Sequence, residues 1–244
     1  MFKNKIYWSL VSLLLLLAVV TGILTRTSYA IEDVSLGNIL EKADQIQVQL
    51  NEDPHYLSIY FENQLTDLSQ LQDQSEVIVK VKMTNERENK MHAVQSGVTV
   101  SEVYKGEGLQ NGDRIYIYEP GFFYNSEVYF GYGGYNVMLE DEEYILFLKH
   151  LPVPKGYRYK GNEAITFLPV SSYFSKYPVS NHGTTQLLEE NAEITYKEVK
   201  DFELLTVNKE MLTQYYSFKK EVMENFNTSE WTLMEKLPKG LYDW

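Results

Sequence analysis

The sequence predicts a mainly β protein that carries an apolar helix at its N-terminus and a second helix near its C-terminus. Three observations support this fold class. Short stretches in which apolar and polar residues alternate follow one another through the middle of the chain, with turn residues between them, as in a closed antiparallel barrel or a sandwich. An uncharged apolar run lies within the first 30 residues. Beyond residue 208 the apolar residues fall at helical spacing.

The N-terminal segment predicts export. Lys3 and Lys5 precede an apolar stretch at residues 6–24, and Arg26 is the next charge. A positive head before an apolar run is a signal anchor or a signal peptide, and both leave the following chain outside the cytoplasm. As a helix, these 19 residues span about 28 Å, close to the ~30 Å hydrocarbon thickness of a bilayer. This length favours a transmembrane helix that crosses the cell membrane once and leaves the C-terminal domain outside.

Signal cleavage is the alternative to anchoring. Ser28-Tyr29-Ala30 places small residues three and one before a cut ahead of Ile31, and cleavage there would give a secreted protein. The expected organisation is therefore a signal anchor or signal peptide at residues 1–30 and a single exported β-rich domain at residues 31–244.

Charge and cysteine content exclude several classes of protein. The 244 residues include 22 Lys and Arg against 34 Asp and Glu, a net charge of -12. Because residues 1–30 contain three of the basic residues and none of the acidic ones, the exported part has a net charge of -15. A nucleic-acid-binding surface needs clustered basic residues, so no nucleic-acid partner is expected. The absence of Cys excludes disulfides, thiolate metal sites, cysteine nucleophiles and a lipoprotein anchor.

Two short helices are expected in the first part of the exported domain. Residues 35–43 place apolar side chains on one face, with Ser35 as the cap. Three leucines at helical spacing in residues 65–71 predict one or two further turns, with Thr66 or Asn63 as the cap.

A hairpin and a series of strands make up most of the remaining chain. Residues 45–50 alternate, turn chemistry follows, and residues 56–61 are apolar, which predicts a β-hairpin. Five further strands are expected, at residues 77–83, 94–104, 114–119, 144–148 and 165–170.

Other features of the middle and end of the chain complete the expected fold. The phase of alternation changes at Ser101–Glu102, which predicts a β-bulge, and residues 85–90 read as a polar turn. One or two more strands are expected in residues 193–206. Asn208 then caps a helix that ends near Phe226.

Three motifs occur in an order that resembles the pattern of a known protein family. These motifs are SEVIVKVKM, VTVSEVYKGEGLQNGDRIYIYEPG and LEDEEYILFLKHL. Together they are similar to a family of exported Gram-positive proteins of unknown function, whose OB-like barrels are related in shape to netrin-like and metalloprotease-inhibitor domains. The resemblance covers about residues 65–170 and implies an OB-like core at about residues 65–206. The family has no established catalytic residues, so the resemblance implies no site.

The residues that carry chemistry form no recognisable catalytic or metal motif. None of the four histidines pairs with another ligand at a metal-binding spacing, and no GxSxG elbow is present. The acidic run at residues 140–143 lacks the alternation of a calcium loop. The glycines at residues 106–112 lead into a strand, whereas a phosphate cradle leads into a helix. No catalytic residue, metal or cofactor is therefore expected.

The unusual feature is an aromatic, glycine-rich segment at residues 118–135. One interpretation is a loop that presents rings to an extracellular protein or a glycan; the other is a β-hairpin whose rings fill one end of the barrel. Successive side chains of a strand alternate between faces, so Phe122 and Phe123 cannot both point inward on a regular strand. The candidate partner-binding residues are Phe122, Phe123, Tyr124, Tyr129, Tyr132 and Tyr135.

The sequence thus predicts a non-enzymatic cell-envelope protein that binds an unknown partner and is held at the membrane by its N-terminal helix. Two other functions remain open at this point. One is a cell-envelope hydrolase on a barrel scaffold, with two carboxylates paired across it. The other is a structural stalk or spacer without an exposed apolar patch.

Overall fold

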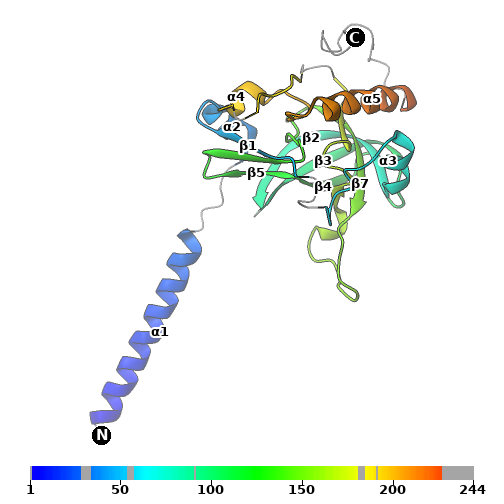
Figure 1. Ribbon diagram of the computed structural model, residues 1–244. Coiled ribbons are helices and arrows are strands. Elements are labelled where there is room, and N and C mark those ends of the chain that lie inside the picture. Colours follow the sequence, from blue (N-terminus) through cyan, green and yellow to red (C-terminus); the bar gives the residue numbers. More distant parts are fainter. Residues whose placement is uncertain are drawn as a thin grey trace. The chain divides into compact units, whose positions relative to one another are not determined.

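The computed structural model describes residues 2–28, 34–53, 58–90, 92–180, 185–190 and 192–226. Within these residues nine strands form two mixed sheets, and five α-helices accompany them (Figure 1). The prediction of a mainly β protein with an apolar N-terminal helix is confirmed. The chain divides into two compact units, Met1–Glu32 and Asp33–Trp244, which are described separately below.

The first unit is the helix α1 (Phe2–Ser28). It contains a 19-residue stretch, Tyr7–Thr25, that is long and apolar enough to cross a membrane or to act as a signal sequence. Two polar side chains inside this stretch bond back to the helix: the Thr21 hydroxyl donates to the Leu17 carbonyl at 2.6 Å and the Thr25 hydroxyl to the Thr21 carbonyl at 2.8 Å. The helix therefore keeps an apolar exterior. The possible cleavage site at Ala30 lies outside the described residues.

The larger sheet of the second unit has six strands whose pairings close on themselves. Its order is β2-β3-β4-β8-β7-β9, and β2 pairs with β7 as well, so the five strands β2, β3, β4, β8 and β7 form a closed circuit. The β4–β8 pair is parallel and the other pairs are antiparallel. The strands are β2 (Val77–Lys90), β3 (Ala93–Lys105), β4 (Arg114–Glu119), β7 (Glu143–His150), β8 (Thr166–Pro169) and β9 (Lys176–Pro178).

The length of β2 and the irregularities in its pairing with β3 allow this closure. Lys80 pairs with Glu102 and Val81 with Val100, which leaves Ser101 as an extra residue in β3 and confirms the predicted bulge. Bulges bend a strand and increase its twist. β2 pairs with this bent β3 along one edge and with β7 along the other. The prediction of a polar turn at residues 85–90 is wrong, because β2 continues through them to Lys90 and pairs with the start of β3.

The smaller sheet has three strands in the order β1-β6-β5: β1 (Gln47–Asn51), β6 (Val128–Tyr132) and β5 (Gly121–Tyr124). The predicted hairpin between residues 45–50 and 56–61 is wrong. β1 pairs in parallel with β6, residues 58–60 form a turn, and Tyr56 and Leu57 lie outside the described residues. Val48 and Leu50 pack with the aromatic core on the inner face of β5 and β6, and this tertiary burial overrides the local hairpin pattern.

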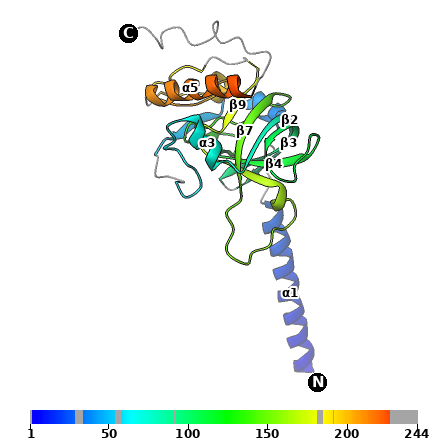
Figure 2. The ribbon, with the colours of Figure 1, turned by 90° about the vertical axis from the view of Figure 1, so that its right-hand side faces the viewer.

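Five helices and helical turns surround the sheets. The cap of α3 is Asp67, which accepts from the Gln70 N–H at 2.9 Å, and not Thr66 or Asn63. Asn208 caps α5 as predicted, and α5 lies across one end of the larger sheet (Figure 2). These elements are α2 (Leu36–Lys42), α3 (Leu68–Gln74), α4 (Tyr196–Val199), α5 (Lys209–Asn225) and the 3-10 turn η1 (Glu163–Ile165).

The prediction of strands in residues 193–206 is also wrong. This segment contains α4, which begins with a capping box between Thr195 and Glu198. Thr-x-x-Glu is the sequence signature of such a box, so the helix start could have been recognised in the sequence.

The buried apolar residues form three clusters. One fills the inside of the closed circuit of strands. A second joins α3 and α5 to the sheet, through residues such as Leu71, Phe147 and Phe218. The third joins α2 and α4 to the smaller sheet, through residues such as Ile39 and Tyr129. The fold therefore positions both sheets and their loops around continuous cores.

Candidate binding groove

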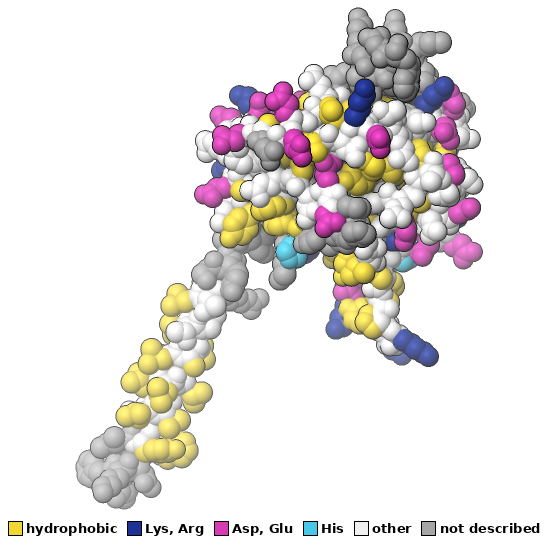
Figure 3. Space-filling view, viewed as in Figure 1, with side chains coloured by type: hydrophobic (Ala, Val, Ile, Leu, Met, Phe, Trp, Pro, Cys, Tyr) yellow, Lys and Arg dark blue, Asp and Glu magenta, His cyan; other side chains and the backbone are white. Residues whose placement is uncertain are grey.

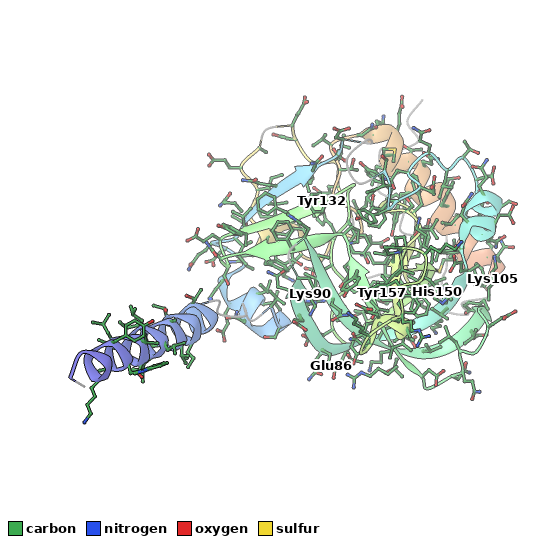
Figure 4. All side chains as sticks on the ribbon, turned by 90° about the horizontal axis from the view of Figure 1, so that it is seen from below. Glu86, Lys90, Lys105, Tyr132, His150 and Tyr157 are labelled. Carbon is green, nitrogen blue, oxygen red and sulfur yellow. The ribbon has the colours of Figure 1, made fainter. Side chains whose placement is uncertain are left out.

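A groove of about 590 Å³ lies where several segments of the second unit meet. Its main walls are the end of β2 with the start of β3, the end of β4, and the loop at residues 151–162 that follows β7, and the segment with Tyr60 and Phe61 adds to the lining. This volume falls within the ~300–1,000 Å³ of typical ligand sites. Lys90 and Tyr157, from two of these walls, are labelled in Figure 4. The lining residues are Tyr60, Phe61, Lys90, His92, Ala93, Tyr118, Glu119, Pro120, Leu151, Pro152, Val153, Pro154, Tyr157, Glu163 and Leu168.

The loop wall is held in place by its own hydrogen bonds. The Tyr157 hydroxyl donates to both oxygens of Glu163 at 3.0 and 2.9 Å, and the Lys160 N–H donates to the same carboxylate at 2.7 Å. The Lys160 N–H bond, followed by the Tyr157 bond, lowers the pKa of Glu163 below its ordinary value, and the bond to Glu163 raises the pKa of Tyr157. The Tyr159 hydroxyl closes the loop by donating to the Leu151 carbonyl at 3.1 Å.

The opposite wall comes from the reversal between β2 and β3. Lys90 forms an ion pair with Glu88 at 2.6 Å, and both side chains are partly exposed. The ring of His92 meets the Phe122 ring edge-on, with centroids 5.5 Å apart. His92 therefore joins the groove to the aromatic hairpin β5–β6.

The only buried carboxylate of the groove lining, among the described residues, is that of Glu119 at the end of β4. It accepts from the Ser96 hydroxyl and from the Met138 N–H, the latter at 2.7 Å. Arg87 donates to the Met138 carbonyl next to it. Glu119 thus ties β4 to β3 and to the segment before β7.

The groove offers apolar and aromatic surface to a ligand. Lys90, His92, Glu119 and Glu163 are its charged or imidazole residues, and three of these four have the intramolecular partners given above. Apolar surface dominates this lining, as it does in most ligand pockets. Among the described residues, no three His, Asp or Glu side chains gather where they could hold a metal ion.

Two of the four histidines lie within the described residues. His92 lies in the groove wall, and the His150 ring contacts the carboxylate of Glu76, next to the start of β2. His55 and His182 lie outside the described residues.

The six predicted partner-binding residues divide between the core and the surface. Phe123, Tyr129, Tyr132 and Tyr135 are buried, Phe122 is half-buried, and Tyr124 is 55% exposed. The alternation expected for Phe122 and Phe123 is present in β5. The Phe122 ring stacks on Phe130 at 4.9 Å, whereas Phe123 and Tyr129 pack inward at 4.9 Å from each other. Most rings of this segment therefore stabilise the hairpin, and Phe122 and Tyr124 remain at the surface.

Sequence reasoning missed the groove-lining residues outside this segment. The sequence predicts a strand at residues 56–61, which contains Tyr60 and Phe61, and it predicts no element at residues 151–162. A signal was present there, since LPVPKGYRY combines two prolines with two tyrosines between two strands and is too long for a tight hairpin turn. Tyr118 and Pro120, at the start of the aromatic segment, do line the groove.

A second polar cluster is buried between the larger sheet and α5. Lys219 contacts both oxygens of Glu203 at 2.7 and 2.8 Å, and the Tyr215 hydroxyl donates to Glu203 at 3.1 Å. Lys176 is 5% exposed, and its ammonium lies 4.8 Å from the centre of the Tyr135 ring. Burial lowers the pKa of Lys176 to about 8. The cavity beside Lys176 and Glu203 has about 20 Å³, room for a water molecule and not for a substrate.

The surface is acidic without large charged clusters in the view of Figure 3. Acidic side chains are spread over the second unit, and hydrophobic side chains gather over the β5–β6 hairpin. No protein-family model matches the chain, and no curated protein matches it at a significant level.

Proposed function

We propose that this protein is an exported, non-enzymatic binding module of the cell envelope, and that the groove holds an apolar segment of an extracellular protein. The observation that carries this proposal is the groove lining. It combines about 590 Å³ of mainly aromatic, aliphatic and proline surface with carboxylates that already accept hydrogen bonds from the domain itself. Such a lining favours holding a ligand over transforming it.

The same lining favours a polypeptide over a glycan. A sugar ring presents several hydroxyl groups, and each needs a donor or acceptor when it is desolvated. Glu119 and Glu163 use their oxygens internally, and Tyr157 directs its hydroxyl at Glu163. An apolar peptide segment loses little on entering this surface, because its side chains need no polar partners.

The strand pairings support an OB-like barrel. The circuit β2-β3-β4-β8-β7 has five strands, with one parallel pair that joins the third and the last strand in chain order. OB folds bind ligands with the loops between their first and second and their fourth and fifth strands. On this assignment these loops are the β2–β3 reversal and residues 151–162, and both line the groove.

The N-terminal helix supports membrane tethering. We propose that α1 stays in the chain as a single-pass anchor, because Tyr7–Thr25 has the length of a membrane span. Secretion after cleavage at Ala30 is the alternative. Intact-mass analysis of the product distinguishes them: a soluble species in the medium that begins at Ile31 would refute the anchor.

Photo-crosslinking on intact cells tests the groove. We expect the wild-type protein to capture a partner protein that Tyr157→Ala loses. Arg158→Ala is the control, since Arg158 is exposed in the same loop but does not line the groove. Val153→Asp is a second groove variant, which places a charge on an exposed lining residue. Equal capture by all four proteins would refute the groove as the binding site.

A further inference from the structure

We propose that the groove recognises a proline-rich segment in the polyproline II conformation, with one or two acidic residues next to the end that lies at Lys90. This inference rests on the proposed function and deepens it, because it names the conformation and the charge of the ligand.

The prolines of the groove walls disfavour strand addition as the mode of binding. Pro120, Pro152 and Pro154 line the groove, and proline has no N–H to donate to an incoming strand. We therefore expect a ligand in this groove to be recognised mainly through its side chains and carbonyl groups. A polyproline II segment has this property, since it forms no internal hydrogen bonds and exposes its carbonyls.

The aromatic residues of the groove match this ligand. Tyr60, Tyr118 and Tyr157 come from three different segments and line the same groove. Proline-rich segments dock into aromatic-lined grooves, where the rings supply flat apolar surface against which the proline rings pack. Preorganisation of the ligand also reduces the entropy lost on binding, which suits an open groove.

The charged residues of the lining determine which charge the ligand carries next to its proline-rich segment. The carboxylate of Glu119 is engaged by Ser96 and Met138, and that of Glu163 by Tyr157 and Lys160. Lys90 is the one lysine or arginine of the described lining. Its pair with Glu88 is partly exposed and such pairs contribute little to stability, so Lys90 is able to turn to a ligand carboxylate.

The net charge of the protein limits how acidic the ligand is. At a net charge of -12, a long acidic peptide is repelled as it approaches. One or two acidic residues placed at Lys90 gain the local attraction without a large long-range repulsion. We therefore expect the ligand to have one or two acidic residues and not a long acidic run.

Fluorescence anisotropy on the full-length chain in lipid nanodiscs tests the inference. The probe is a labelled synthetic peptide, Asp-Asp-Pro-Leu-Pro-Pro-Leu-Pro. A matched peptide with Ala in place of every Pro should bind about tenfold more weakly or worse, which corresponds to about 1.4 kcal/mol. A peptide with Lys in place of Asp should bind about three- to tenfold more weakly at low salt, and this difference should shrink as salt screens the charges.

Protein variants assign the effects to residues. Tyr157→Ala and Val153→Asp should each weaken the proline peptide about tenfold or more, as removal of a central contact does. Arg158→Ala, in the same loop but outside the lining, should leave its affinity unchanged. Lys90→Gln should reduce the preference for the Asp peptide over the Lys peptide. Near-UV circular dichroism shows that each variant keeps its tertiary packing.

The outcomes separate this inference from the proposed function. Equal binding of the proline and alanine peptides, both lost in Tyr157→Ala, would overturn the polyproline inference and leave the groove as a peptide site. Displacement of bound peptide by oleate, with tighter binding of oleate than of any peptide, would show a lipid-chain site and overturn it as well. The proposed function fails separately, if crosslinking on cells captures nothing that depends on the groove.

Discussion

Two aromatic regions of the second unit, the β5–β6 hairpin and the loop at residues 151–162, place their rings in different surroundings. The β5–β6 hairpin pairs along its whole length, so alternate rings such as Phe123 and Tyr129 are turned into the core. The loop at residues 151–162 contains prolines and no strand, and Tyr157 in it is 40% exposed. Aromatic content alone therefore does not mark a binding surface. Whether a ring is buried depends on whether its backbone is paired in a sheet, because a paired strand directs alternate side chains into the core.

Removal of a hairpin ring should have the largest effect. Tyr129 is fully buried, packs on Phe123 and Tyr196, and donates its hydroxyl to the Tyr135 carbonyl at 2.9 Å. We expect Tyr129→Ala to lower the free energy of unfolding by about 3–5 kcal/mol, as large core truncations do. Urea denaturation followed by fluorescence measures it. Tyr157→Ala in the loop should leave the urea midpoint of unfolding unchanged. A similar loss of unfolding free energy in both variants would show that the two regions do not differ in their contribution to the core.

Glycine substitutions in the two regions should differ less in the unfolding free energy that they cost. Gly133 after β6 has a φ of +55°, and an added Cβ would collide with the Ser172 side chain. Gly156 in the loop has a φ of +88° and open space around it. We expect Gly133→Ala to cost about 2–4 kcal/mol, from backbone strain plus overpacking, and Gly156→Ala only the strain, about 1–2 kcal/mol. Equal losses in thermal or urea unfolding would show that packing around Gly133 is looser than described.

The buried Lys176 predicts that the stability of the folded domain rises with pH above about pH 8. Its pKa is lowered from 10.5 to about 8 in the folded protein, so between these values the unfolded chain binds more protons and stability rises with pH. From pH 8 to about 9.5 the gain should approach 2 kcal/mol, at 1.36 kcal/mol for each pH unit. Lys176→Met should lack this rise. The difference between wild type and variant, measured by urea unfolding at each pH, would stay constant if Lys176 did not titrate there.

The smallest expected effect is that of chelator and reductant. The sequence contains no Cys, and the described residues contain no cluster of three metal-binding side chains. We expect the melting temperature to change by less than about 2 °C in EDTA or dithiothreitol. A fall of about 5 °C or more, roughly 2 kcal/mol in a domain of this size, would show that a bound ion stabilises one of the regions.

Local patterns predicted the elements whose structure depends on nearby residues. The strand Arg114–Glu119, the bulge at Ser101 and the cap at Asn208 could all be derived from alternation and capping chemistry. The partner of β1 could not, because Gln47 pairs with Val128 about 80 residues away and nothing local specifies a parallel neighbour. The groove could not be predicted from the sequence for the same reason. Tyr60, Tyr118 and Tyr157 meet only after the circuit of strands closes.

The distance along the chain between β1 and β6 also affects how the protein is made. β1 emerges from the ribosome about 80 residues before its partner, which at about 5–20 residues per second is a delay of roughly 4–16 s. During this time Val48 and Leu50 lack the aromatic surface that later covers them. The early strand is thus exposed to proteases and to mispairing until the hairpin has been synthesised, and factors that slow elongation between residues 51 and 128 should lower the yield of folded protein.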